Sequence, residues 1–127
     1  MSFLEPARLE RALGVGRIIA GAGAWLAPRT FWERSGLPAA AADPEAVMLG
    51  RLFGSRDVVL GAALLMGDNA TRRAVIRMGV PIDAADLIAA AVARRHLSPK
   101  ALASLAGGAV AALITAAIVE SSNRQAS

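Results

Sequence analysis

The chain has 127 residues, the usual size of one domain, and contains no Cys, which excludes disulfide scaffolds, thiol catalysis and Cys-based zinc sites. It is 55% hydrophobic and only 19% charged, with a mean hydropathy of +0.48, whereas a soluble domain usually has about 25% charged residues. The net charge is +4, but no basic stripe with interleaved aromatic residues accompanies it, so nucleic acid is not an expected partner.

Four apolar segments predict helices, and each is close to the roughly 20 residues that cross a hydrocarbon core of about 30 Å. The second segment begins at Asp43-Pro44-Glu45 and the fourth at Ser98-Pro99, where a capping side chain precedes a proline in the first turn. No stretch alternates as the strands of a transmembrane barrel do. The sequence therefore predicts an all-α fold, a single four-helix transmembrane domain over residues 1–127, with helices at about 8–27, 44–66, 71–95 and 99–120.

The sequence also predicts the behaviour of the first apolar segment and of the C-terminal stretch. The first apolar segment has no basic start before it and no convincing cleavage site after it, so we expect a retained helix and not a signal peptide. The polar stretch 121–127 is expected to fray.

The link between the first two helices, residues 28–42, mixes aromatic and charged residues. Trp25, Phe31 and Trp32 lie in or beside it, and both Trp residues of the chain are among them. Because amphipathic rings favour the headgroup level of a bilayer, these three residues form a predicted interfacial anchor. The alternative is that Phe31 and Trp32 only pack on the end of the bundle. Residues 37–42 are expected to be a small-residue connector.

The first two helices contain an internal repeat with an offset of forty residues. Arg11-Ala12-Leu13-Gly14 matches Arg51-Leu52-Phe53-Gly54, and the stretch 18–22 matches 58–62. The repeat is either a true duplication or a chance likeness in an Ala/Gly-rich chain. In both cases the glycines fall on one helical face, where bare backbone lets two membrane helices approach closely.

Charged residues inside the apolar segments are the most informative feature of the sequence. Each costs roughly 2.5–3.5 kcal/mol at the centre of a membrane helix, so these residues are expected to face the bundle interior and to pair. Arg17 and Asp57 occupy similar places in the two repeats with opposite sign, which suggests that they pair. The predicted polar core comprises three Arg and three Asp, namely Arg17, Arg51, Arg56, Asp57, Asp83 and Asp86.

This polar core has two interpretations that the sequence leaves open. It is either a site for a headgroup, a proton relay or a partner's charge, or an ion-pair network that only fixes the helix register. Pro81 lies just before Asp83 and is expected to kink the third helix there. The single His, His96, has no second His or Cys to form a metal site, and no nucleophile motif is present. We therefore expect no enzyme activity, no cofactor and no metal.

The run Leu49-Gly50-Arg51-Leu52-Phe53-Gly54-Ser55-Arg56-Asp57, followed by Arg72-Arg73 and then Asp83-x2-Asp86, resembles uncharacterised small bacterial membrane proteins, especially actinobacterial ones. The general layout is similar to that of DoxX-like four-helix proteins, over roughly residues 11–118. The resemblance implies a four-helix membrane fold and no catalytic residues. Small multidrug exporters resemble the chain less, because they carry a glutamate in the first helix where this chain has Arg17.

Three functions are compatible with these features. The first, which we favour, is a non-enzymatic accessory or assembly protein of the inner membrane that contacts lipid and docks a larger membrane protein or a second copy of itself. The second is a small proton-coupled transporter or carrier that uses Asp57, Asp83 and Asp86. The third is a soluble helical bundle that binds an apolar ligand. The flanking basic residues divide almost equally, and we expect a multi-pass protein with both termini in the cytoplasm.

Overall fold

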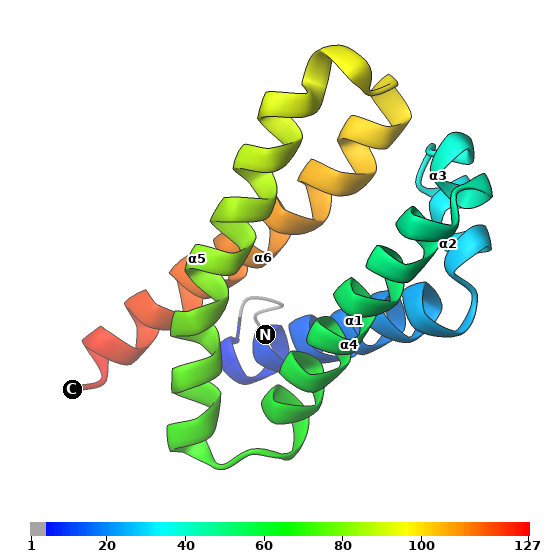
Figure 1. Ribbon diagram of the computed structural model, residues 1–127. Coiled ribbons are helices and arrows are strands. Elements are labelled where there is room, and N and C mark those ends of the chain that lie inside the picture. Colours follow the sequence, from blue (N-terminus) through cyan, green and yellow to red (C-terminus); the bar gives the residue numbers. More distant parts are fainter. Residues whose placement is uncertain (1–4) are drawn as a thin grey trace.

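A computed structural model describes residues 5–127, and in this part of the chain every regular element is a helix. The long helices are α1 (Pro6–Leu26), α4 (Pro44–Met66), α5 (Asn69–Ala93) and α6 (Pro99–Gln125) (Figure 1). The short ones are α2 (Pro28–Arg34), α3 (Pro38–Ala42) and a 3-10 helix, η1 (Arg94–His96). The predicted all-helical fold is confirmed. Of the described helices, only α6 is long and apolar enough by itself to cross a membrane.

Side-chain caps fix the starts of three long helices. The carboxylate of Asp43 accepts the Glu45 backbone N–H at 2.9 Å, and the Ser98 hydroxyl oxygen accepts the Ala101 N–H at 3.1 Å, as their sequence context predicts. Asp68 caps α5 in the same way by accepting the Thr71 N–H at 2.8 Å. Each cap satisfies a backbone donor that has no partner inside its helix.

Two segments are more helical than the sequence predicted. Residues 28–42 form two short helices where a connector was expected at 37–42, because Pro28 and Pro38 are each preset for a first helical turn. Residues 121–125 of the stretch expected to fray are helical, since α6 continues to Gln125. Glu120 and Arg124 are one turn apart there, with their charged atoms 3.7 Å from each other, and such a pair supports the last turns.

The long helices form two antiparallel hairpins, α1 with α4 and α5 with α6 (Figure 1). The start of α1 meets the start of α5, where Glu10 Oε2 lies 3.6 Å from Arg72 Nε. The opposite ends of the hairpins also meet, because Gly36, between α2 and α3, contacts the first turn of α6. Gly36 has φ +83°, and a Cβ there would lie 2.9 Å from the Ala101 backbone nitrogen. The start of α1 and the end of α6 therefore lie at the same end of the bundle.

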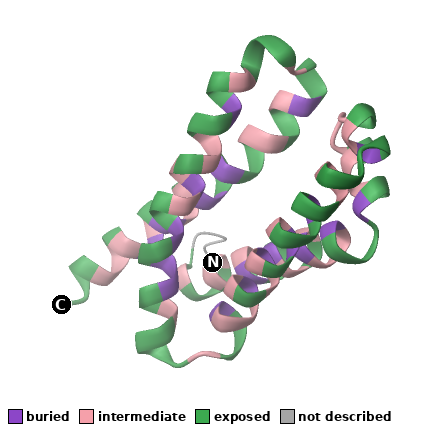
Figure 2. Cartoon of the chain, viewed as in Figure 1, coloured by how far each residue is buried: buried purple, intermediate pink, exposed green. Residues whose placement is uncertain are grey.

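The burial pattern is inverted relative to that of a water-soluble domain. In residues 5–127, seven of the eleven buried hydrophobic residues are Ala, and the only large side chains with almost no exposure are those of Leu64 and Val119. Figure 2 shows the buried residues as narrow stripes, with exposed and intermediate residues over the rest of each long helix. Among the described residues, sixteen large hydrophobic residues are exposed, including Ile19, Val59 and Ile88. The interior thus consists mainly of small residues, three charged side chains and one apolar cluster around Leu64, Val75 and Ile76.

Candidate functional site: a charged cluster between α1, α4 and α5

Glycine packing brings α1 and α4 together and sets the geometry of the site. A Cβ at Gly21 would lie 2.6 Å from the Gly54 carbonyl oxygen, and a Cβ at Gly61 would lie 2.6 Å from the Gly14 carbonyl oxygen. Real Cβ atoms do not approach backbone this closely, so any larger residue would force the helices apart. The repeated glycines of the two segments thus pair crosswise, the first of one repeat with the second of the other. This close packing places Arg17 and Asp57 opposite each other between the two glycine contacts.

Arg17 bridges two buried carboxylates from different helices. Its Nη1 lies 3.3 Å from Asp57 Oδ1 on α4, and its Nη2 lies 2.5 Å from Asp83 Oδ2 on α5. The Arg17, Asp57 and Asp83 side chains are all at least nine-tenths buried. The predicted Arg17–Asp57 pair is present, and Asp83 is a second partner that the repeat did not reveal. A single guanidinium therefore links three helices.

Gly79 lies against this bridge, a role that the sequence analysis did not assign. Gly79 lies one turn before Asp83 on α5, and a Cβ at its position would lie 3.4 Å from Arg17 Nη2. The Arg17 guanidinium therefore rests against bare backbone. The spacing Gly-x3-Asp, with both residues on one helical face, is the signal that points to this role. Pro81 lies between them, and α5 continues through it as a helix.

A second ion pair lies at the outer edge of the cluster. Arg56 Nη2 is 2.8 Å from Asp86 Oδ2, and both side chains are about one-third exposed. The Arg56 guanidinium also lies 4.8 Å from the centre of the Phe53 ring, within the range of a cation–π contact. Arg56 Nε is 3.7 Å from Asp57 Oδ1, which is close enough for charge attraction but too long for a hydrogen bond. This Nε is buried and has no hydrogen-bond acceptor among the described residues.

Arg51 does not belong to the polar core, and its assignment there was wrong. Its side chain is exposed, its Nε donates a hydrogen bond to the Trp25 carbonyl at 3.2 Å, and its guanidinium lies 5.9 Å from the centre of the Trp25 ring. The cause is the helical rotation. Asp57 follows Arg51 by six positions, which places the two side chains about 120° apart around α4 at 3.6 residues per turn.

Because Arg51 lies outside the cluster, the charge balance of the cluster differs from the expected one. Two guanidinium groups, those of Arg17 and Arg56, remain against the three carboxylates of Asp57, Asp83 and Asp86. The expected balance of three against three is therefore not present. The fully buried part is also uneven, because one Arg faces two Asp. Burial of an unmatched charge is costly, so the cluster favours one additional positive charge, such as a proton.

The predicted anchor residues lie together at the end of the α1–α4 hairpin. Trp32 donates its indole N–H to the Ala46 carbonyl at 3.0 Å, and its ring fills the space beside Gly50, where a Cβ would lie 3.0 Å from Nε1. Phe31 packs edge-on against Trp32, with 5.3 Å between ring centres. Phe31 and Trp32 thus pack on the bundle end, whereas Trp25 is about half exposed. This packing is compatible with an interfacial position as well.

Comparisons with known proteins give no assignment. No family model matches the chain, and no curated protein sequence or solved structure shows significant similarity to it.

Proposed function

We propose that the chain is an integral membrane protein that crosses the bilayer with α1, α4, α5 and α6. The observation that carries this proposal is the inverted burial: Arg17, Asp57 and Asp83 lie inside, while sixteen large hydrophobic residues of the described part of the chain lie on the surface. Exposing so many large apolar side chains to water is unfavourable, and in lipid it has no such cost. Charges inside a membrane bundle, in turn, are expected to face the interior and to pair.

By composition, α1, α4 and α5 are poor membrane spans because they contain charged residues. The positions of most of these charges nevertheless support the proposal. Arg17, Arg56, Asp57, Asp83 and Asp86 all take part in ion pairs within the cluster, whereas Arg51 and Arg77 are exposed outside it. The outward faces of these helices carry large apolar residues such as Ile19, Val59 and Ile88. The hydropathy averaged over all residues of a helix therefore underestimates how apolar its outward surface is, and this is the surface that lipid would contact.

We further propose that this membrane protein is a non-enzymatic accessory or assembly protein. Arg17 joins three helices through its two carboxylate partners, and such a network fixes helix register, which is the best-attested use of buried polar groups. The rigid core would hold the outer apolar faces in a fixed arrangement, suitable for a larger membrane protein or a second copy of this chain. The resemblance to DoxX-like membrane proteins points to the same four-helix layout. We place both termini in the cytoplasm.

Extraction of native membranes tests the first part of the proposal. The protein should remain in the pellet after carbonate or high-salt washing and should require detergent for release. Purification in mild detergent then tests the accessory role, because a specific partner or a defined oligomer should elute with the chain. Recovery of a monodisperse protein without detergent would reject the membrane proposal and leave the soluble apolar-ligand bundle. A detergent-solubilised monomer with no partner would reject the accessory role alone.

The charge count of the cluster favours a second candidate, a small proton-coupled carrier. Three carboxylates against two guanidinium groups leave one negative charge that a proton can neutralise. A carboxylate that gains and loses this proton would couple proton movement to the transport of a solute. Protein in liposomes should then show pH-dependent flux that Asp57→Asn abolishes, together with carbodiimide labelling of a membrane carboxyl. Absence of flux for wild-type protein under a pH gradient would leave the accessory role.

A further inference from the structure

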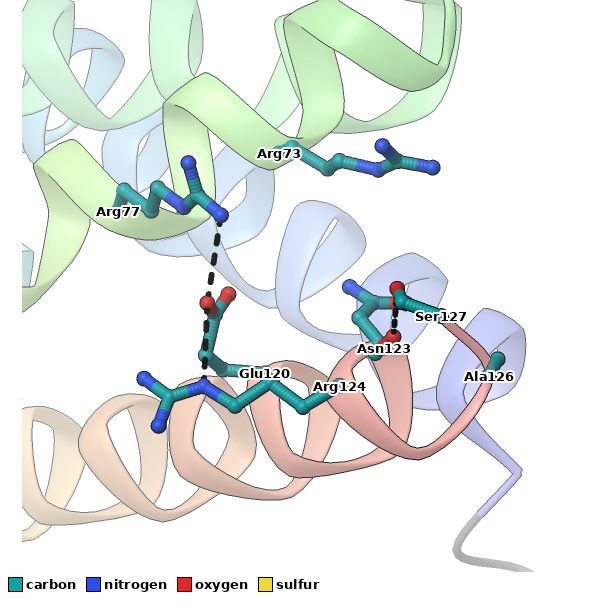
Figure 3. Close-up of a pocket in the computed structure, with 7 residues that line it drawn as sticks. All are labelled: Arg73, Arg77, Glu120, Asn123, Arg124, Ala126 and Ser127. Atoms are coloured by element: carbon teal, nitrogen blue, oxygen red, sulfur yellow. Dashed lines mark hydrogen bonds and ion pairs between the residues drawn. The ribbon is translucent and has the colours of Figure 1, made fainter.

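We propose that the cytoplasmic ends of α5 and α6 form a binding site for the phosphate of an anionic phospholipid. The site rests on the proposed membrane location, and it is separate from the Arg17 cluster. It is a cavity of about 200 Å³ at the end of the second hairpin (Figure 3). Its lining residues are Arg73, Arg77, Glu120, Asn123, Arg124, Ala126 and Ser127.

The charge of this cavity is suited to a phosphate group. Three guanidinium groups, from Arg73, Arg77 and Arg124, and one carboxylate, that of Glu120, line the cavity, so its side chains carry two positive charges in excess. Glu120 lies between two of them, with its Oε1 3.3 Å from Arg77 Nη2 and 3.7 Å from Arg124 Nε (Figure 3). The carboxylate thus holds two guanidinium groups near one place and neutralises only part of their charge. Guanidinium groups bind phosphate oxygens through paired N–H donors.

The three Arg side chains are accessible, as a binding site requires. About two-thirds of the Arg77 side chain and four-fifths of the Arg124 side chain are exposed, and Arg73 is exposed as well. Arg73 and Arg77 are one helical turn apart on α5, so their side chains leave the helix on the same face. Asn123 from α6 and Ser127 just beyond its end add polar groups to the cavity.

An adjoining groove with apolar residues favours a lipid over a free anion as the occupant. The groove continues between α5 and α6 with a volume of about 500 Å³ and shares Arg77, Glu120 and Arg124 with the basic cavity. Beyond these residues it is lined by Ile76, Val80 and Ala116. The basic cavity with its apolar continuation thus has the amphipathic order of a phospholipid, with the phosphate at the helix ends and an acyl chain along the groove. Basic pockets between membrane helices bind anionic headgroups in this way.

Lipid titration followed by native mass spectrometry tests the site. Wild-type protein and the variant with Arg73→Gln, Arg77→Gln and Arg124→Gln would be titrated with phosphatidylglycerol and with phosphatidylcholine in detergent. We expect wild type to bind one phosphatidylglycerol in preference to phosphatidylcholine, and the variant to bind it at least about tenfold more weakly. The matched control replaces Arg29, Arg34 and Arg95 by Gln, which removes the same charge from exposed positions at the opposite end of the bundle. This control should bind as wild type does.

The outcomes separate the lipid site from the membrane proposal. Equal loss of phosphatidylglycerol in both triple variants would overturn the site, because it would show attraction by overall charge. Displacement of the lipid by millimolar inorganic phosphate or glycerol phosphate would assign the cavity to a free anion and overturn the lipid assignment. Reconstitution of the same samples into liposomes reports insertion independently. Inserted protein with no lipid preference would reject the site alone, whereas failure of wild type to insert would reject both proposals.

Discussion

Gly21 on α1 and Gly54 on α4 lie against each other so closely that neither position has space for a side chain. A Cβ at Gly21 would lie 2.6 Å from the Gly54 carbonyl oxygen and 2.8 Å from the Val58 backbone nitrogen. This contact keeps α1 and α4 at the separation at which the Arg17 guanidinium reaches Asp57 on one side and Asp83 on the other. The glycine stripe and the ion pairs are thus parts of one arrangement.

Gly21→Ala should therefore destabilise the protein. A methyl group at this position would meet backbone atoms that cannot move aside, and overpacking of this kind costs about 1–3 kcal/mol. Thermal unfolding in detergent, followed by circular dichroism, should show a lower melting temperature. Gly16→Ala and Gly23→Ala on the same helix are the controls, since a Cβ at either position has no atom within 4 Å. These controls should melt at the wild-type temperature or above it, because Ala favours a helix more than Gly does. An equal loss in all three variants would argue against the close contact.

Arg17→Met should be more damaging than the loss of either carboxylate partner alone. It leaves Asp57 and Asp83 buried without their shared counter-ion, and breaking a buried pair in this way costs about 3–5 kcal/mol. The folded yield, measured by size-exclusion chromatography in detergent, should fall sharply. Arg51→Met on α4 removes an equal charge outside the cluster and should have little effect.

A second change should partly restore the Arg17→Met protein. Adding Asp83→Asn, and then Asp57→Asn, removes the unpaired carboxylates one by one, and the yield should rise at each step. If the single Arg17→Met variant folds as well as wild type, the ion pairs contribute nothing to the bundle and the polar-core account is wrong.

Asp68, in the turn between α4 and α5, provides a test by pH. The Thr71 backbone N–H donates to its carboxylate, and this hydrogen bond lowers the pKa of Asp68 below its ordinary value. Because the folded pKa is lowered, the stabilisation is complete above the ordinary Asp pKa of about 3.9 and is lost as the pH falls through the lower folded value. Asp68→Asn can still cap the helix but does not titrate there. Wild type should thus melt above the variant at pH 6, and the difference should shrink towards pH 3. A constant difference would contradict the cap.

Fluorescence quenching by depth tests the interfacial anchor. Trp25 and Trp32 lie at the same end of the α1–α4 hairpin, and both should be quenched more by nitroxides at headgroup depth than by nitroxides at the bilayer centre. Trp25→Phe and Trp32→Phe leave one Trp each and separate the two signals. Stronger quenching from the bilayer centre would place this end inside the hydrocarbon and exclude the anchor.

The sequence predicted the long helices and one key ion pair because both have local signals. Capping residues followed by proline marked the starts of α4 and α6, and the repeat placed Arg17 opposite Asp57. The contact between Asp83 and Arg17 depends on how α5 packs against the first hairpin. The periodicity of the sequence contains no information about this packing. Arg51 was misplaced because the spacing Arg-x2-Gly-x2-Asp drifts by about 120° around a helix. The short helices α2 and α3 were missed since 5–7 residues are too few for a periodic pattern.

The central claim, that the large apolar side chains on the outside face lipid, is tested most directly by cysteine accessibility. The chain contains no Cys, so single replacements report on single sites. Ile19→Cys, Val59→Cys, Ile88→Cys and Ile114→Cys sample one position on each long helix, and all four side chains are more than half exposed in the structure. Arg95→Cys and Ser121→Cys are the water-exposed controls, and all variants would be treated in native membranes with a charged maleimide. We predict rapid labelling of the two controls and little labelling of the four apolar positions until detergent is added. Rapid labelling of all six positions without detergent would place the apolar faces in water and contradict the membrane account.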